Sequence, residues 1–511
     1  MHILIGHECG VAAVALKKPM EYYPKGGAIY FLYLMLNELQ NRGQETCGFF
    51  SFNPNRTRTL DGFKTVGLVN DLFRVKNPED RDRILFEYAG IRAEGHVRYA
   101  TSGHSKGEKD WLDEAQPFYR RDGNPHKRFV LGWNGNIANY RELKCYLEER
   151  YGVVPETSVD TELLMYLITY NIEEFYNGNR EPNFLDVLKR TQEKIDGGMS
   201  LVLMNGLGHI VAYRGVPGIM PLCYGENENL FAVASETSAL ARIGIKDYKF
   251  FKPGQLILYN DSLKSVQLGD PNNLRACFFQ QLYFAKIVSV LDSLGVNEFR
   301  EAIGGKMAEI EPLRGKLDDR YVLVPVPDTS IPAARRMASR LGIGYEEVLI
   351  KNPQAGRTFI EKDNMRKERM QIKFSYTPGK VEGRKIILVD DSIVRGNTAQ
   401  MIVSEVRKAF DPEEIHLRST CPPIVSPCFY GVDFPTFNEL IAHGYNDKRV
   451  LEEELARRFE ANSVSYMTID GLLEVFDSLG FSRDNLCTAC ITGNYPTDYG
   501  KIRLEELVSK L

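Results

Sequence analysis

The sequence predicts a protein of mixed α/β and α+β class with two large domains and a helical extension, and three observations support this prediction. The chain has 511 residues, more than one ordinary hydrophobic core holds. Up to about residue 265, short β-type runs such as CGVAAVAL and LFAVASE are separated by glycine turns, which favours stacked sheets. Further on, continuous apolar runs end in acidic residues and precede helical patterns, which is typical of parallel βαβ units.

The expected elements follow these patterns along the chain. In the first half, strands are expected in CGVAAVAL, RFVLGWNGNIANY, SLVLMNGLGHIVAYR, LFAVASE and GQLILYN, and helices in IYFLYLMLNELQNRG and DTELLMYLITYNIEEFY. In the second half, the strands YVLVPVP and KIILVDD precede the helices IPAARRMASRLG and NTAQMIVSEVRKAF. The turn-rich stretch LGDPNNLRA marks a boundary. We therefore expect domains at 9–265 and 266–470, followed by a helical segment at 471–511 that contains CTAC.

Composition narrows the class of function. The chain is 43% hydrophobic and 26% charged, close to the globular average, and its formal net charge of -4 argues against sequence-independent binding of nucleic acid. No apolar run approaches the ~20 residues that cross a bilayer. We therefore expect a cytoplasmic protein with neither nucleic-acid nor membrane partners. In such a compartment the nine cysteines are expected as thiols or metal ligands rather than disulfides.

The stretch RKIILVDDSIVRGNT is the most specific motif of the chain. A buried strand would deliver two adjacent carboxylates to its end, and a small-residue turn would then lead into a helix. Backbone N–H groups of such a turn can hold a phosphate, whereas the carboxylates would engage sugar hydroxyls or hydrated Mg²⁺. The candidate ligand-binding residues are Asp390, Asp391, Ser392, Ile393, Val394, Arg395, Gly396, Asn397 and Thr398. The alternative is an ordinary strand-to-helix turn.

A second group of residues has the chemistry for cleaving an amide with a thiol. Cys9 is the candidate nucleophile, and its free α-amine would act as the base once residues 1–8 (MHILIGHE) are removed. The side chain of Asn134 and the N–H of Gly135 suit an oxyanion hole. Arg98 suits an α-carboxylate, and Asp160 suits an α-ammonium group. Taken singly, these residues also fit a small apolar residue, a hairpin turn, a surface ion pair and a helix cap.

Together with NRGQETCG (41–48), these segments resemble the glutaminase domain of the N-terminal-nucleophile class, while RKIILVDDSIVRGNT resembles the phosphoribosyl pyrophosphate signature of type I phosphoribosyltransferases. The combination resembles the amidophosphoribosyltransferases over nearly the whole chain. The resemblance implies an αββα glutaminase sandwich, followed by a phosphoribosyltransferase domain with a parallel sheet. It also implies the first step of purine synthesis: glutamine is hydrolysed at Cys9, and the ammonia passes through a channel to phosphoribosyl pyrophosphate, giving 5-phosphoribosylamine, glutamate and pyrophosphate.

The resemblance also implies further site residues and partners. Arg42 and Gly43 would bind glutamine, and Arg357 would lie in a basic flap over the pyrophosphate. Two metal groups are implied: Mg²⁺ at Thr329, Asp390 and Asp391, and a [4Fe–4S] cluster at Cys277, Cys428, Cys487 and Cys490. Spacing alone does not distinguish iron–sulfur from zinc at these cysteines. The family further suggests purine-nucleotide feedback and a homo-oligomer, either a tetramer or a dimer.

Four segments depart from the family pattern. FAKIVS (284–289) replaces FARPDS, PQAGRTFI replaces RYVGRTFI, RGVPGIMPL replaces RDP-GIRPL, and RGNT replaces RGTT. These changes leave open a diverged paralogue that senses phosphoribosyl pyrophosphate or nucleotides, or an amidotransferase of different specificity. Glucosamine-phosphate and asparagine synthetases also begin with such glutaminases, but the phosphoribosyl motif argues against both.

Overall fold

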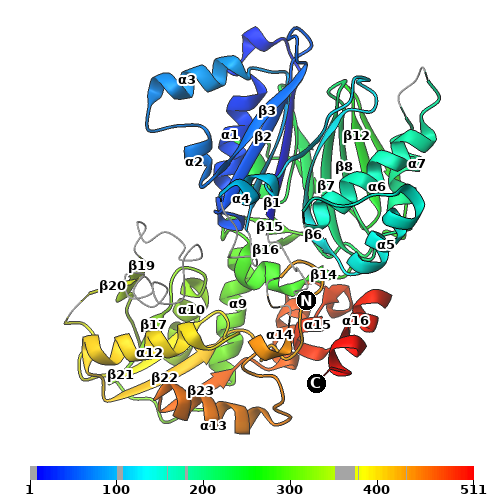
Figure 1. The fold of residues 1–511 in the computed structure, drawn as a ribbon. Helices are drawn as coiled ribbons and strands as arrows, with labels where there is room; N and C mark the ends of the chain where they lie inside the picture. The colour runs from blue at the N-terminus through cyan, green and yellow to red at the C-terminus, as the bar shows by residue number, and fades with distance from the viewer. Residues whose placement is uncertain are drawn as a thin grey trace.

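The computed structural model describes residues 9–99, 108–157, 159–178, 182–351, 374–377, 379–432, 434 and 436–510. Two face-to-face β-sheets form the amino-terminal half, and a parallel sheet flanked by helices forms the carboxy-terminal half (Figure 1). The expected leader at residues 1–8 and Arg357 in the expected flap both lie outside the described residues. Within the described ranges, no helix is both long and apolar enough to cross a bilayer.

The first sheet has seven antiparallel strands with Cys9 at the start of a central one. In sheet order the strands are β11 (Tyr248–Phe250), β9 (Cys223–Glu226), β10 (Leu230–Ala234), β1 (Cys9–Leu16), β4 (Arg92–Arg98), β2 (Thr46–Phe52) and β3 (Leu60–Val66). Its outer face packs against α1 (Ala28–Glu38), α2 (Val69–Leu72), α3 (Pro78–Glu87) and α8 (Thr237–Arg242). Because both faces of β1 are buried, its sequence is apolar throughout.

The second sheet has six antiparallel strands. In sheet order they are β13 (Leu263–Gln267), β12 (Gln255–Tyr259), β8 (Ile210–Arg214), β7 (Gly197–Asn205), β6 (Phe129–Ile137) and β5 (Phe118–Arg120). Helices α5 (Tyr140–Tyr151), α6 (Asp160–Phe175) and α7 (Phe184–Gln192) cover its outer face, and the short α4 (Glu108–Asp113) precedes β5. Val11, Phe50, Val202 and Phe231 belong to the core between the two sheets. This arrangement is the expected αββα sandwich.

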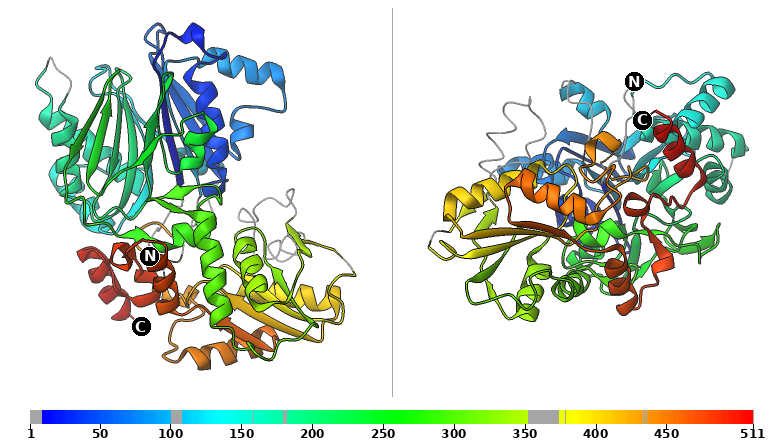
Figure 2. Two further views of the ribbon diagram at one scale, coloured as in Figure 1. Left: turned by 180° about the vertical axis from the view of Figure 1, so that it is seen from behind. Right: turned by 90° about the horizontal axis from the view of Figure 1, so that it is seen from below.

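The carboxy-terminal half is built on a five-stranded parallel sheet, seen from behind and from below in Figure 2. The strand order is β18 (Gly344–Tyr345), β17 (Tyr321–Pro325), β21 (Lys385–Asp390), β22 (Glu414–Ser419) and β23 (Ser463–Tyr466). One core contains side chains of α9 (Val296–Glu309), α10 (Ile331–Leu341) and α14 (Ile469–Ser478), and a second contains those of α12 (Asn397–Phe410) and α13 (Lys448–Phe459). The parallel sheet between helices confirms the predicted class of the second half.

Several small elements complete the fold. They are the π-helix η3 (Gln280–Phe284), α15 (Ala489–Thr492), α16 (Asp498–Val508) and three two-stranded pairs: β14 (Ala276–Cys277) with β24 (Leu486–Cys487), β15 (Val290–Leu291) with β16 (Leu294–Gly295), and β19 (Leu349–Lys351) with β20 (Phe374–Tyr376). Arg503 on α16 donates from Nε to the carbonyl of Ala138, at 3.0 Å. The carboxy-terminal helices thus contact the amino-terminal half, and the boundaries expected near 265 and 470 stay predictions.

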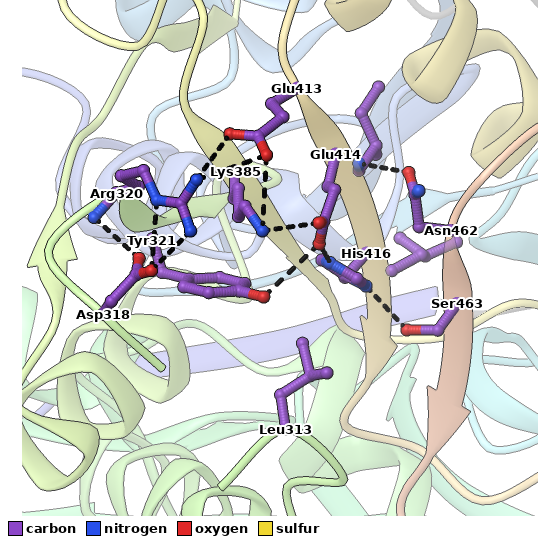
Figure 3. Close-up of polar contacts among 12 residues, drawn as sticks. Leu313, Asp318, Arg320, Tyr321, Lys385, Glu413, Glu414, His416, Asn462 and Ser463 are labelled. Atoms are coloured by element: carbon purple, nitrogen blue, oxygen red, sulfur yellow. Dashed lines mark hydrogen bonds and ion pairs between the residues drawn. The ribbon is translucent and has the colours of Figure 1, made fainter. Parts of the chain in front are cut away.

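A polar network joins the starts of the parallel strands (Figure 3). The Nζ of Lys385 lies 2.6 Å from Glu414 Oε1, and the Nε2 of His416 donates to Glu414 Oε2 at 2.8 Å. Tyr321 donates to the same carboxylate, while the other ring nitrogen of His416 lies 2.9 Å from Ser463 Oγ. These contacts stabilise the amino edge of the sheet. In open parallel sheets, ligands bind at the opposite edge, where the strands end.

Candidate active sites

Cys9 lies in a row of three side chains that crosses the first sheet. The register pairs Cys9 on β1 with Arg98 on β4, and Arg98 with Thr46 on β2. Directly opposed residues of antiparallel strands place their side chains on the same face. Val11, the next residue on this face of β1, belongs to the core between the sheets, so the row faces the second sheet. All three side chains are buried.

Asn134 and Gly135 lie inside β6, which faces the first sheet. The Nε2 of His96 on β4 donates to the carbonyl of Trp133 at 2.9 Å, which brings β4 against β6 just before Asn134. Asn134 is fully buried, and neither its Oδ1 nor its Nδ2 has a hydrogen-bond partner among the described residues. Such a buried amide costs about 1–3 kcal/mol unless a ligand satisfies it.

Gly135 occupies a position that no other residue fits. Its φ is +156°, and an added Cβ would lie 1.9 Å from the carbonyl oxygen of Gly198 on β7. The expected alternative of a hairpin turn at NGN is wrong, because residues 129–137 pair continuously with β7. The glycine therefore keeps β6 in close contact with β7 beside Asn134.

Asp160 and Arg98 supply opposite charges to the same buried space. Asp160 is the first residue of α6, and its Oδ2 accepts from the N–H of Ile137 at 3.3 Å. Burial raises the pKa of Asp160 to about 7, with the N–H of Ile137 and the guanidinium of Arg98 acting against this. Arg98 donates to Glu114 at 3.3 Å through Nη2. Within the described ranges, the Nη1 of Arg98 and the Oδ1 of Asp160 have no partner, so each can receive a ligand group of opposite charge.

Arg42 and Gly43 support this site from the loop after α1. The Nε of Arg42 donates to the carbonyl of Cys9 at 2.9 Å, and its Nη1 forms a 2.7 Å ion pair with the buried Glu236. A third contact joins its Nη2 to Gln280 Oε1. A Cβ on Gly43 would lie 2.5 Å from the backbone nitrogen of Arg98, so only glycine lets the loop pass β4 this closely. Arg42 therefore holds the backbone of Cys9.

The second site lies where β17 and β21 end. Asp390 is the last residue of β21, and the hydroxyl of Thr329, in the loop after β17, donates to Asp391 Oδ2. The hydroxyl of Ser392 donates to Asp391 Oδ1 at 2.9 Å. These contacts place the predicted hydroxyl and carboxylate ligands of Mg²⁺ side by side. Oxygen donors of this kind suit that ion.

The predicted phosphate loop connects β21 to α12. Gly396 has a φ of +80° and is the N-cap of α12, which begins at Asn397. Ile393 is buried beneath the loop, Arg395 forms a 2.9 Å ion pair with Glu439, and the first turn of the helix presents Asn397 to solvent. The structure thus brings together the sequence-predicted residues of this loop at the carboxyl edge of the parallel sheet.

The four predicted cluster cysteines converge from three segments. Parallel pairing of β14 with β24 sets Cys277 beside Cys487, and all four contribute to or pack against one core. Burial raises the pKa of Cys490 well above its usual value, and the thiols of Cys428 and Cys277 add to this effect. However, among the described residues no three His, Cys, Asp or Glu side chains are grouped as metal ligands. No disulfide joins any of the nine cysteines, all of which lie within the described ranges.

Comparisons with known proteins agree with this geometry. A glutamine amidotransferase domain family matches residues 107–242. The amidophosphoribosyltransferase of Methanothermobacter thermautotrophicus is 36% identical over 493 residues, which cover 96% of this chain and 94% of the relative. The chain belongs to the amidophosphoribosyltransferase family.

Two solved structures match the fold over the same length. Glutamine phosphoribosylpyrophosphate amidotransferase from B. subtilis, complexed with ADP and GMP, is 31% identical, with a TM-score of 0.78 over 96% of this chain and 98% of its own. An allosteric regulatory enzyme of purine biosynthesis is 32% identical, with a TM-score of 0.80 over 96% and 97%. These matches confirm the predicted fold class and the predicted function, a glutamine-dependent amidotransferase of purine synthesis. They do not favour the nucleotide-sensing paralogue.

Sequence reasoning missed several buried polar residues near the proposed glutamine site of this amidophosphoribosyltransferase. Thr46 completes the row with Cys9 and Arg98, and its hydroxyl has no partner within the described ranges. The spacing of Glu94 and His96 could have identified them. They alternate with Arg98 along β4, and such residues share one face of a strand. No local pattern pointed to Glu236, because its partners come from distant segments.

Proposed function

We propose that Cys9 becomes the first residue of the mature chain and hydrolyses glutamine for a phosphoribosyl transfer at the second site. The observation that carries this proposal is the set of unsatisfied, buried polar atoms around Cys9. An amide from Asn134, a guanidinium nitrogen from Arg98 and a carboxylate oxygen from Asp160 have no partner among the described residues. They match the side-chain oxygen, α-carboxylate and α-ammonium of an amino-acid amide.

The first reaction follows from these positions. The Cys9 sulfur attacks the amide carbon of glutamine, forming a C–S bond, while the carbonyl electron pair moves to the oxygen. The Asn134 amide and the Gly135 N–H stabilise this oxyanion. The α-amine of Cys9, with an ordinary pKa near 8, takes the thiol proton and passes it to the departing nitrogen as the C–N bond breaks. Water then cleaves the thioester, which releases glutamate.

At the second site, ammonia attacks carbon 1 of phosphoribosyl pyrophosphate, the bond to the pyrophosphate oxygen breaks, and 5-phosphoribosylamine forms. The loop of residues 392–398 and the start of α12 would hold the 5-phosphate through backbone N–H groups. Thr329, Asp390 and Asp391 would hold Mg²⁺, which would balance the charge of the pyrophosphate. Delivering ammonia directly matters because free ammonia is dilute and mostly protonated near neutral pH.

The iron–sulfur cluster also belongs to this proposal. The chemistry of four converging thiols at Cys277, Cys428, Cys487 and Cys490 fits a [4Fe–4S] cluster, although they are not grouped as ligands among the described residues. Phe429, next to Cys428, accepts at its carbonyl from the buried side chain of Asn136 on β6, at 2.8 Å. A cluster here would therefore brace the segment that supports the oxyanion strand.

The remaining partners follow from the family. Because the B. subtilis relative is complexed with ADP and GMP, we infer that purine nucleotides act as feedback inhibitors of this chain. A homo-oligomer (tetramer or dimer) and a cytoplasmic location stay predictions. Light scattering of the purified protein measures the first, and fluorescence microscopy of a tagged chain measures the second.

The deciding experiment measures glutamate release from glutamine, with and without phosphoribosyl pyrophosphate, on anaerobically prepared protein. We expect Cys9→Ser to abolish use of glutamine and to leave pyrophosphate release with ammonia measurable. Mass spectrometry should find a chain that begins at Cys9. An intact Met1, or a trimmed chain without glutaminase activity, would instead favour a sensor, and equal loss of both activities would contradict two separate sites.

A further inference from the structure

Glu236 is a fully buried carboxylate that contacts both halves of the chain. Its Oε1 accepts from Arg42 Nη1 at 2.7 Å and from Asn41 Nδ2 at 3.0 Å, both in the loop after α1. Its Oε2 accepts from the backbone N–H of Lys286 at 2.9 Å and from the Ser289 hydroxyl at 2.6 Å. One oxygen thus serves the glutamine half, and the other serves the segment 284–289 (FAKIVS).

On the glutamine side, the contact continues to the nucleophile itself. Arg42 donates from Nε to the carbonyl of Cys9, so its guanidinium bridges Glu236 and the first residue of β1. Neither side chain of the Arg42–Glu236 pair is exposed to solvent. A displacement of Glu236 therefore cannot be absorbed by water and must move Arg42 or break a buried ion pair.

On the other side, Arg300 holds the segment that precedes Lys286. From α9, its Nε donates to the carbonyl of Gln281 at 3.0 Å, and its Nη2 donates to those of Tyr283 and Ala285, at 3.2 and 2.9 Å. Burial lowers the pKa of Arg300 to about 10, opposed by the carboxylates of Asp391 and Glu236. Arg300 therefore fixes the backbone that leads to Lys286, one of the contacts of Glu236.

Helix α9 in turn touches the element that follows the metal-side loop. A Cβ added to Gly304 on α9 would lie 2.0 Å from the carbonyl oxygen of Ala333 on α10, so the two helix backbones are in direct contact. Helix α10 begins at Ile331, two residues after Thr329, whose hydroxyl donates to Asp391. A continuous set of contacts thus runs from the acidic pair to the carbonyl of Cys9.

We propose that Glu236 is a positioning residue that couples occupancy of the phosphoribosyl site to the geometry of Cys9. This inference rests on the proposed function of both sites and adds the residue that joins them. Ammonia made without an acceptor is lost, so a device of this kind keeps glutamine hydrolysis in step with phosphoribosyl transfer. The physical test of this role is a measured change in the coupling between the two sites.

Two variants separate the contacts of the two carboxylate oxygens of Glu236. Glu236→Gln keeps an oxygen for Arg42, but its amide nitrogen cannot accept from Lys286 and Ser289. Ser289→Ala removes a single hydrogen bond to Oε2. Thr237→Val is the matched control, because Thr237 hydrogen-bonds to the backbone of Val290 in the same segment without contacting the Glu236 carboxylate. Thermal unfolding of each variant identifies any that fail to fold.

The readout is the rate at which iodoacetamide alkylates Cys9, followed by peptide mass spectrometry with and without phosphoribosyl pyrophosphate. This rate needs no turnover. In the unmodified chain, the sugar pyrophosphate should change the rate, and Ser289→Ala should reduce that response about fivefold. The ratio of glutamate release with and without the sugar should fall in parallel, while pyrophosphate release with ammonia stays unchanged.

The inference would be overturned if phosphoribosyl pyrophosphate did not change the alkylation rate of Cys9 in the unmodified chain. It would also be overturned if both Ser289→Ala and Glu236→Gln kept the full change in rate, or if Thr237→Val lost as much of that change as they do. The double variant Glu236→Gln/Ser289→Ala should respond no less than Glu236→Gln alone, because both act through one oxygen. Absence of glutamate release from the unmodified chain would instead overturn the proposed function, and the alkylation rates would still decide the role of Glu236.

Discussion

Cys9 and Arg98 lie directly opposite each other on β1 and β4, so the proposed nucleophile and the proposed carboxylate clamp share one row of the sheet. Asn134 belongs to the facing sheet, and Asp160 begins the helix that packs behind it. A substrate bound beside Cys9 would therefore lie between the two sheets of the sandwich. Substitutions at Arg98 and at Asp160 test the two sides of this proposed binding site separately.

Arg98→Lys should raise the KM for glutamine about 10- to 100-fold with a smaller change in kcat. Lysine keeps the charge but loses the planar pair of N–H donors that a carboxylate accepts, an interaction of about 1.5–3 kcal/mol. Arg92→Lys is the control, since Arg92 lies on the same strand but pairs with Asp261 away from Cys9. Steady-state kinetics of Arg98→Lys with glutamine and with ammonia test this prediction. An equal loss of activity with both nitrogen donors would contradict a role in glutamine binding.

Asp160 should make glutamine binding sensitive to pH near neutrality. Burial raises the pKa of its carboxyl to about 7, so acidification below that pH neutralises the group that would attract the α-ammonium. The KM for glutamine should therefore rise as the pH falls from 8 to 6. Asp160→Asn should give a high KM that does not vary with pH. A flat profile in the unmodified chain would remove Asp160 from the site.

Most of the fold could be predicted because local patterns specify it. NTAQMIVSEVRKAF predicts a helix at 397–410, and α12 spans Asn397–Phe410. CGVAAVAL predicts a strand at 9–16, and β1 spans Cys9–Leu16. Periodicity and turn residues act over a few neighbours, so they are visible in the sequence.

The contacts of the sites were less predictable, because they join distant segments. Nothing near Arg42 in the sequence indicates that its guanidinium pairs with Glu236 or reaches the carbonyl of Cys9. The carboxylate comes from the start of α8 and is chosen by tertiary packing alone. Sequence patterns therefore identified the type of chemistry, whereas the contacts that hold the candidate residues in place needed the structure.

Gly396→Ala should impair phosphoribosyl transfer from both ammonia and glutamine, and leave basal glutamine hydrolysis intact. The φ of Gly396 is +80°, a conformation that other residues adopt with strain, and an added Cβ would lie 2.3 Å from Ile441 Cδ1, so either the Ile441 side chain or the phosphate loop must shift. Gly379→Ala is a close control, since Gly379 has a φ of +83° with no atom within 4 Å of its added Cβ. If both variants lose transfer equally, backbone strain rather than loop position is responsible.

Glu94 should make the stability of the glutaminase sandwich fall as the pH rises. Burial between the sheets raises the pKa of its carboxyl well above its usual value, and the N–H groups of Gly132 and Met204 only partly oppose this. Above the unfolded pKa of about 4.3, the unfolded chain has released this proton while the folded chain retains it. The unfolded state then binds fewer protons, so each pH unit lowers the free energy of unfolding by up to about 1.4 kcal/mol until the folded pKa is reached.

Glu94→Gln removes this titration. Its free energy of unfolding, relative to that of the unmodified chain, should therefore rise as the pH goes from 5.5 to 7.5. Urea-unfolding midpoints at the two pH values measure the difference. Glu87→Gln, at an exposed position, should leave the pH dependence unchanged. A constant gap between Glu94→Gln and the unmodified chain at both pH values would show that Glu94 titrates normally in the folded protein. The carboxyl would then have to be solvated between the sheets, where its side chain has no exposed surface.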